Sequence, residues 1–197
     1  MITKGSNPLE ALGERSLAPL LKAYFELNHL KQLYRQGWLR RGVPIERAES
    51  VAEHVFSMAM LAWWIADAHF PQLDCDRVIR MVLAHELGEI YAGDITPGDN
   101  MPAEEKHRLE RASLLRVIEP LPNAAELLAL WEEFEAAETP EAIFVKQIDR
   151  LEMAFQAAVY EHQGFGSMEE FFATTDQAVI DPILRGIFEA LNEARPS

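Results

Sequence analysis

Apolar residues recur at the spacing of an α-helix along almost the whole chain. The first such run predicts a helix from Leu17 toward Arg35. Ser50 and Glu53 then form a capping box, and Pro71 ends the helix that these two residues begin. No segment shows a convincing apolar–polar alternation of the kind that is typical of strands. The pattern therefore predicts an all-α fold.

The second half of the chain continues this pattern, and its helices begin at recognisable caps. Thr139 is an N-cap that is followed by a first-turn proline, and Asn123 with Glu126 forms another capping box. The predicted helices cover residues 74–90, 104–118, 123–137 and 140–162, followed by a short segment around Phe171 and a final helix from Pro182.

The predicted domain organisation is simple. Gly5, Pro8 and Gly13 predict a flexible N-terminal arm over residues 1–15. The rest of the chain has no internal repeat, low-complexity tract or linker long enough to separate two domains. A length of 197 residues fits one domain, since domains commonly have about 100–200 residues. We therefore expect a single compact multi-helix bundle over residues 16–197.

Composition narrows the classes of function. The chain has 49% hydrophobic residues, which supports a packed core, and 18 basic against 32 acidic residues give a net charge of −14. A chain this acidic lacks the basic surface that binds a nucleic acid polymer or an anionic membrane. No stretch approaches the roughly 20 apolar residues of a membrane span, and Cys75 has no partner for a disulfide. We therefore expect a cytoplasmic protein.

Two histidines stand on helix faces that should be apolar. His54 shares its stripe with aliphatic residues, and His85 ends an apolar stripe and is followed by Glu86 and Glu89. A single such histidine is more often a hydrogen-bonded core residue than a ligand. Here, however, several ionisable groups gather at the end of a largely apolar helix, where burial is costly unless they are paired or coordinated. Asp94 follows in a Gly-Asp turn, where the alternative is a residue that caps its own backbone.

A third group lies far along the chain. In the helix that begins at Pro140, Asp149, Glu152 and Gln156 form a polar stripe beside the apolar one. A solvated face is the simpler interpretation of this stripe when it is considered alone. Two imidazoles and carboxylates from separate helices, however, are a plausible ligand set for a divalent metal ion.

Three segments resemble those of a known family. They are residues 49–54 (ESVAEH), residues 85–89 (HELGE) with residues 93–97 (GDITP), and residues 146–152 (KQIDRLE). A lone His, then a His–acid pair, then a distant Asp is the pattern of the HD-domain metal-dependent phosphohydrolases. The segments are most similar to those of the small 5′-deoxynucleotidase-like members, over most of the chain. The resemblance implies a helical HD-domain bundle.

The resemblance also implies one divalent metal ion (Mn, Co, Fe, Ni, Zn or Mg) held by His54, His85, Glu86 and Asp149. Glu86 departs from the family, which normally has Asp there. Its extra methylene group leaves coordination feasible, but it also allows a catalytically silent nucleotide- or metal-binding module. A di-iron subgroup of the same fold inserts additional histidines before the last Asp. The only intervening histidine here is His107, in a heavily charged helix, so one metal ion is favoured.

For the reaction, the resemblance gives Glu89 the role of general base or water-orienting group, and its position one helical turn beyond His85 suits that role. Asp94 would hold either the ribose or the attacking water. The phosphate also needs cations, and the resemblance implies an Arg-Trp element, although an ordinary solvated basic loop is the alternative. The candidates for substrate binding are Arg35 and Trp38, with Arg40 and Arg41 as alternatives to Arg35, and Lys146, which lies one turn before Asp149.

The predicted function is hydrolysis of (deoxy)ribonucleoside 5′-monophosphates to nucleoside and phosphate. Hydrolysis of a nucleoside triphosphate or a cyclic nucleotide is an alternative, and so is the silent module. Related small proteins commonly form dimers, and the apolar helix that contains Trp63 and Trp64 offers an interface. We therefore expect a homodimer that takes a small nucleotide as its partner.

Overall fold

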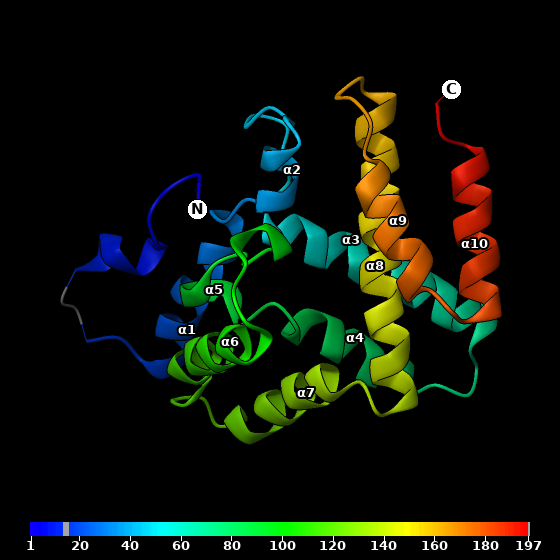
Figure 1. The fold of residues 1–197 in the computed structure, drawn as a ribbon. Helices are drawn as coiled ribbons and strands as arrows, with labels where there is room; N and C mark the ends of the chain where they lie inside the picture. Colours follow the sequence, from blue (N-terminus) through cyan, green and yellow to red (C-terminus); the bar gives the residue numbers. More distant parts are fainter. Residues whose placement is uncertain (14–15, 197) are drawn as a thin grey trace.

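The computed structural model describes residues 1–13 and 16–196, which form helices joined by turns (Figure 1). The described part of the chain has no strand, only the isolated bridges of Thr3 with Leu33 and of Tyr34 with Ser50, so the all-α prediction is confirmed. No helix among these residues is both long and apolar enough to cross a bilayer. The α-helices are α1 (Pro19–Leu27), α2 (Gln36–Arg40), α3 (Val51–His69), α4 (Cys75–Ala84), α5 (Glu89–Ala92), α6 (Ala103–Ile118), α7 (Ala124–Ala136), α8 (Pro140–His162), α9 (Glu169–Ala178) and α10 (Pro182–Glu193), and short 3-10 helices cover Pro8–Leu12, Asn28–Lys31 and Pro97–Asp99.

The two long helices α3 and α8 form the frame of the molecule. α3 packs against α4 and α8, while α8 also packs against α7, α9 and α10. In Figure 1, α8 is the long upright helix, with α9 and α10 beside it. Both frame helices begin at the predicted caps, because the Ser50 side chain accepts a hydrogen bond from the N–H of Glu53 and the Thr139 side chain accepts one from the N–H of Ala142.

Two predicted helices end earlier than the apolar period suggests. The first stops at Leu27, where the Asn28 side chain donates a 2.7 Å hydrogen bond to the backbone oxygen of Tyr24 and the chain continues as a 3-10 helix. The helix that was predicted over residues 74–90 breaks after Ala84 and resumes as the short α5. The short helix α2 has no counterpart among the predicted helices.

The turn between α4 and α5 depends on Gly88. A Cβ atom at this position would lie 2.9 Å from the Cβ of Glu110 and 3.0 Å from its backbone oxygen, both in α6. Only a residue without a side chain therefore allows α6 to approach so closely. This contact brings Glu110 next to the turn that carries Glu86 and Glu89.

The predicted N-terminal arm contacts the body of the molecule at its start. The N–H of Lys4 donates to the backbone oxygen of Gln32 over 2.7 Å. The Gln36 side chain accepts from the N–H of Ile2 over 2.8 Å and donates to its oxygen over 2.7 Å. The predicted boundary between arm and domain falls at residues 14 and 15, which lie outside the described residues.

Two clusters of buried apolar side chains form the core. The larger cluster draws mainly on α3, α4, α8, α9 and α10, and the smaller one on α1, α5 and α6, while α7 contributes to both. Leu87 packs against both clusters. The turn that follows α4, with its His–acid pair, therefore lies at the seam between the two parts of the core.

Candidate functional site

Side chains from three helical segments converge beside this seam. His54 comes from the first turns of α3, His85 from the end of α4 and Asp149 from the middle of α8. One ligand atom from each lies within 4.8 Å of the others. Glu86 joins them, because its Oε1 lies 3.3 Å from His85 Nε2 and 3.8 Å from His54 Nε2. The structure therefore brings all four predicted ligands together.

Each imidazole is oriented through its other nitrogen. His54 Nδ1 lies 2.6 Å from Glu152 Oε2, and His85 Nδ1 lies 2.6 Å from the backbone oxygen of Val82. Both partners are acceptors, so each Nδ1 carries a proton, and each Nε2 faces the cluster, where its lone pair binds either a proton or a cation. This is the arrangement in which a second hydrogen bond fixes a metal-binding histidine.

The two Nε2 atoms provide a test of whether the residues fit a metal ion. Both are buried, and neither makes a hydrogen bond of good geometry among the described residues, while a carboxylate oxygen lies 3.3 Å from each, from Asp149 at His54 and from Glu86 at His85. A buried polar atom without a partner is costly, and a cation shared by His54, His85 and Asp149 would satisfy both lone pairs. Two imidazole nitrogens and carboxylate oxygens form a donor set that suits a divalent transition metal ion. The residues present therefore fit such an ion.

The charges of the cluster also favour a bound cation. Burial opposes protonation of His54, but Glu152 and Asp149 outweigh it and raise its pKa to about 10. Burial also opposes ionisation of Glu86, but His85 and Arg35 hold its pKa well below the usual range. The site thus favours additional positive charge, whether a proton or a metal cation supplies it.

A cleft of about 360 Å³ opens above the cluster and contains further acidic groups. Glu89 is buried on its wall, with Oε2 unpartnered among the described residues, and burial together with Glu86 and Asp94 raises its pKa well above the usual range. Asp94 Oδ2 accepts a 2.5 Å hydrogen bond from the N–H of Gln36. Glu89 and Asp94 therefore line the same cleft as His85, Glu86 and Asp149.

Of the three candidate arginines, only Arg35 lines this cleft. Its Nη1 lies 3.2 Å from Glu86 Oε1 and 3.2 Å from Asp94 Oδ1, and no other guanidinium nitrogen of Arg35 donates to a side chain among the described residues. Arg40 pairs with Asp99 and Arg41 pairs with Glu170, both outside the cleft. Arg35 thus keeps unused N–H groups beside the cluster.

The other two predicted substrate-binding residues differ in exposure. Trp38 contributes to the cleft wall but is only 2% exposed, and its Nε1 donates a 2.8 Å hydrogen bond to Glu49. Lys146 also lines the cleft, where its Nζ lies 2.9 Å from Glu135 Oε1 and 3.6 Å from the centre of the Phe134 ring.

Several residues in or beside the cleft were not predicted to belong to the site. Glu152 had a signal, because it follows Asp149 by three positions and therefore lies on the same helix face. Lys106, Glu110 and Phe171 had none, since their position depends on how α6 and α9 pack. These residues come to the cleft through tertiary contacts that no local pattern encodes.

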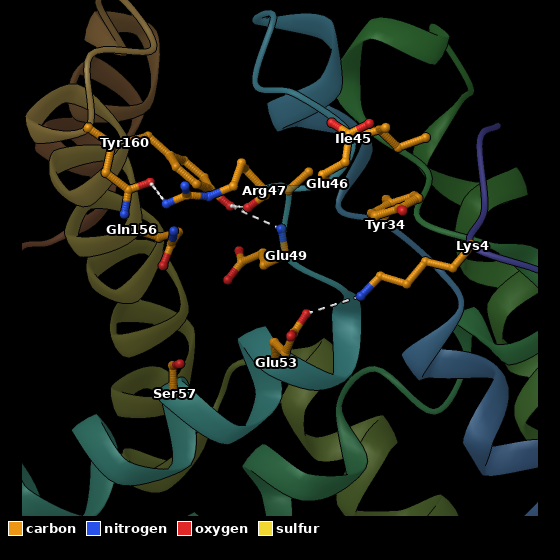
Figure 2. A pocket seen from close by; sticks show the side chains of 12 residues that line it. Lys4, Tyr34, Ile45, Glu46, Arg47, Glu49, Glu53, Ser57, Gln156 and Tyr160 are labelled. Carbon is orange, nitrogen blue, oxygen red and sulfur yellow. Dashed lines mark hydrogen bonds and ion pairs between the residues drawn. The ribbon is translucent and has the colours of Figure 1, made fainter.

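A second cavity, of about 380 Å³, is lined by Glu49, Glu53 and Tyr160 among other residues (Figure 2). Glu49 lines it and forms a close buried group with His54 and Glu152. Burial and the nearby Glu152 raise the pKa of Glu49 to about 7. Figure 2 shows the ion pair of Lys4 with Glu53 at the edge of this cavity. Glu49 therefore links the second cavity to Trp38, which donates to it, and to Glu152, which orients His54.

Comparisons with known proteins agree with this geometry. The family model described as HD domain matches residues 27–189. The 5′-deoxynucleotidase HDDC2 of Homo sapiens is 39% identical, with 89% of this chain and 84% of that protein covered. The 5′-deoxynucleotidase hdd1 of Schizosaccharomyces pombe is 34% identical, over 90% of this chain and 89% of that protein.

Solved structures show the same fold. A conserved hypothetical protein from Pyrococcus furiosus superposes with a TM-score of 0.74 at 28% identity, covering 88% of this chain and 99% of that one. A predicted metal-dependent phosphohydrolase from Magnetospirillum magnetotacticum superposes with a TM-score of 0.66 at 28% identity, covering 90% and 93%.

Proposed function

This chain belongs to the HD domain family, and we propose that it is a metal-dependent phosphomonoesterase that converts 2′-deoxynucleoside 5′-monophosphates to nucleoside and phosphate. The observation that carries the proposal is the convergence of His54, His85 and Asp149 with two buried, unpartnered Nε2 atoms. The substrate class follows the names of the relatives, which are 5′-deoxynucleotidases at 34% and 39% identity over most of this chain.

We assign the metal-binding role to His54, His85, Glu86 and Asp149, which would hold one divalent ion. Such an ion polarises a phosphoryl oxygen and makes a water molecule more acidic. The donor set favours Mn, Fe, Co, Ni or Zn over Mg, because imidazole is a ligand for borderline metals. The longer side chain of Glu86 is no obstacle to this role, since its Oε1 lies 3.3 Å from His85 Nε2.

The acidic residues of the cleft would handle the proton and the attacking water. Glu89 begins α5, four residues after His85, and its buried Oε2 is free to accept a proton from water. Asp94 is held by the N–H of Gln36 and by Arg35, so its role is to fix the Arg35 side chain and to face the water or the sugar.

Arg35 is our assignment for the phosphate contact. Its Nη1 is committed to Glu86 and Asp94, which hold the guanidinium in one orientation at the edge of the cleft. The remaining N–H groups form the donor fork that suits a bidentate contact with a phosphate. Lys146 lines the same cleft, against Glu135, and adds positive charge to it.

A metal-resolved substrate panel tests the proposal. We expect the purified chain to release phosphate from deoxynucleoside monophosphates with an added divalent transition metal, and a chelator to abolish the release. His85→Ala should remove both the activity and tight metal binding, because one of two imidazole ligands is lost. The matched control is His107→Ala, because His107 lies outside the cluster, half-exposed beside Glu135. Absence of phosphate release from every monophosphate with every metal would reject the proposal.

Glu86 supports a second experiment on the silent alternative. Glu86→Asp shortens the carboxylate by one methylene and restores the acid that the family normally carries. If the chain is an active enzyme as it stands, this variant should change the rate or the metal preference only modestly. Substantial activity that appears only in Glu86→Asp would instead identify the natural chain as a silent binding module.

We also propose a homodimer formed through the exposed face of α3. Phe56, Trp63 and Trp64 on this helix are 68%, 50% and 63% exposed, which is unusual for large apolar side chains on one helix. Light scattering should give twice the mass of one chain for the natural protein and the mass of a single chain for a Trp63→Ser, Trp64→Ser variant.

The free thiol of Cys75 is compatible with a reducing compartment, so we propose a cytoplasmic location.

A further inference from the structure

The cleft has a charged part and an apolar part. The charged part holds His85 and the acids of the cluster together with Arg35, while the apolar part is lined by Gly37, Trp38, Phe171 and other apolar side chains. A nucleoside monophosphate has the same division, because its phosphate is dianionic and its sugar and base carry no charge. The apolar part therefore has the chemistry to contact the nucleoside.

Trp38, the aromatic residue that the sequence offers for this contact, is not the one presented to the cleft. Its ring is packed between Tyr160 and Phe171, with centroid distances of 5.1 and 4.2 Å, and only 2% of the residue is exposed. Its Nε1 is committed to Glu49. Phe171 covers Trp38, is partly exposed and lines the cleft.

Phe171 is also held close to the phosphate-binding Arg35. A Cβ atom on Gly37, two positions after Arg35, would lie 3.4 Å from Cε1 of Phe171, an ordinary van der Waals distance, so the ring lies directly against α2. The ion pair of Arg41 with Glu170 joins the end of α2 to the start of α9. The ring and the guanidinium are therefore fixed to the same short helix.

We infer that Phe171 is the side chain that contacts the nucleoside part of the substrate, and that Trp38 is a positioning residue that supports it from beneath. This inference rests on the proposed function, since it concerns the same cleft. An aromatic face accepts any base by stacking, and it packs against a deoxyribose, which lacks the 2′-hydroxyl group that an apolar wall would leave without a hydrogen bond.

The test compares two probes that share the phosphate but differ in the nucleoside. Phe171→Ala should raise KM for deoxyadenosine monophosphate by about 10-fold or more, because base–aromatic stacking contributes at that level, while kcat stays within about threefold. The inhibition constant of inorganic phosphate should stay within about twofold, since phosphate does not reach the ring. Phe171→Tyr should restore KM, and Phe171→Leu, which keeps apolar volume without an aromatic face, should not.

Phe165→Ala is the matched control. Phe165 packs against the other side of the same aromatic group, 5.9 Å from Tyr160, and does not line the cleft. It should leave KM unchanged if the effect of Phe171 is contact with substrate. An equal rise in KM for both variants, an equal change for nucleotide and inorganic phosphate, or no change in Phe171→Ala would overturn the inference. Lack of phosphate release by the unmodified chain would instead reject the proposed function.

Discussion

Two arginines each lie between two carboxylates, and they differ in how many donors they use. Arg195, near the C-terminus, binds Glu161 through Nε at 2.9 Å and Nη2 at 3.0 Å, and Glu169 through Nη2 at 2.8 Å. Arg35, in the cleft, gives only Nη1 to its two acidic partners. Their side chains are almost equally exposed, at 20% and 17%. Exposure therefore does not distinguish them, whereas the use of donors does.

The difference indicates what each cluster is for. A guanidinium that binds carboxylates through two of its nitrogens cross-links its own chain, as Arg195 joins α8 to the C-terminal end of the chain. A guanidinium held through one nitrogen keeps the rest of its fork for another oxyanion. The proposed substrate contact of Arg35 thus follows from hydrogen bonds that are available, not from charge alone.

The largest expected effect comes from removing the N–H donors of Arg35. Arg35→Met keeps most of the side-chain volume but has no donor, so KM for a deoxynucleoside monophosphate should rise by about 10- to 100-fold, as expected for lost hydrogen bonds to a charged group. Steady-state phosphate release measures it. Arg195→Met is the matched control and should leave KM unchanged. If the two variants raise KM equally, the distinction between the two arginines is wrong.

An intermediate effect is expected from a carboxylate that acts through a histidine. Glu152→Gln keeps a hydrogen-bond acceptor for His54 Nδ1 but removes the charge that makes the ring a stronger ligand, so metal affinity should fall by about tenfold. Titration calorimetry with Mn²⁺ measures this without substrate. Gln156→Ala, one turn further along α8, is the control, and unchanged affinity in Glu152→Gln would show that the charge of Glu152 does not tune His54.

The smallest expected effect is on stability, and it comes from the pH-dependent ion pairs of Arg195 with Glu161 and Glu169. The hydrogen bonds from Arg195 outweigh burial and hold the pKa of Glu161 below its usual value. The unfolded value is about 4.3, so this stabilisation is present above that pH and is lost as the pH falls through the folded-state pKa. Arg195→Met should cost about 0.5–1 kcal/mol at pH 7 and less at pH 3.5. Urea unfolding at both values checks this, and a difference that persists undiminished at low pH would contradict it.

Sequence alone predicted much of the site because its ligands interrupt helical periods. His54 and His85 stand on apolar stripes, so spacing singles them out, whereas Asp149 begins a polar stripe that spacing alone assigns to solvent and that only the family resemblance assigns to the site. The all-α fold follows from the same periods, and the starts of α3 and α8 follow from their caps.

The remainder depends on contacts between distant segments. Spacing does not show that Arg40 and Arg41 are taken up by Asp99 and Glu170, or that Trp38 is covered by a residue of α9. The break after α4 also has no strong local signal, because Gly88 matters only where α6 comes against it. Which arginine and which aromatic ring face the cleft is therefore a tertiary property.

Because it lies beside the seam at Leu87, the proposed ion would also stabilise the fold. His54 and Asp149 belong to the two frame helices, whereas Glu86 sits in the turn that touches both parts of the core. A cation held by all three exists only on the folded chain, so at 100 times its dissociation constant it adds about 2.7 kcal/mol to the unfolding free energy. For a chain of this size the melting temperature would climb by several degrees. Heat resistance is thus a readout that ranks candidate ions before any substrate has been identified.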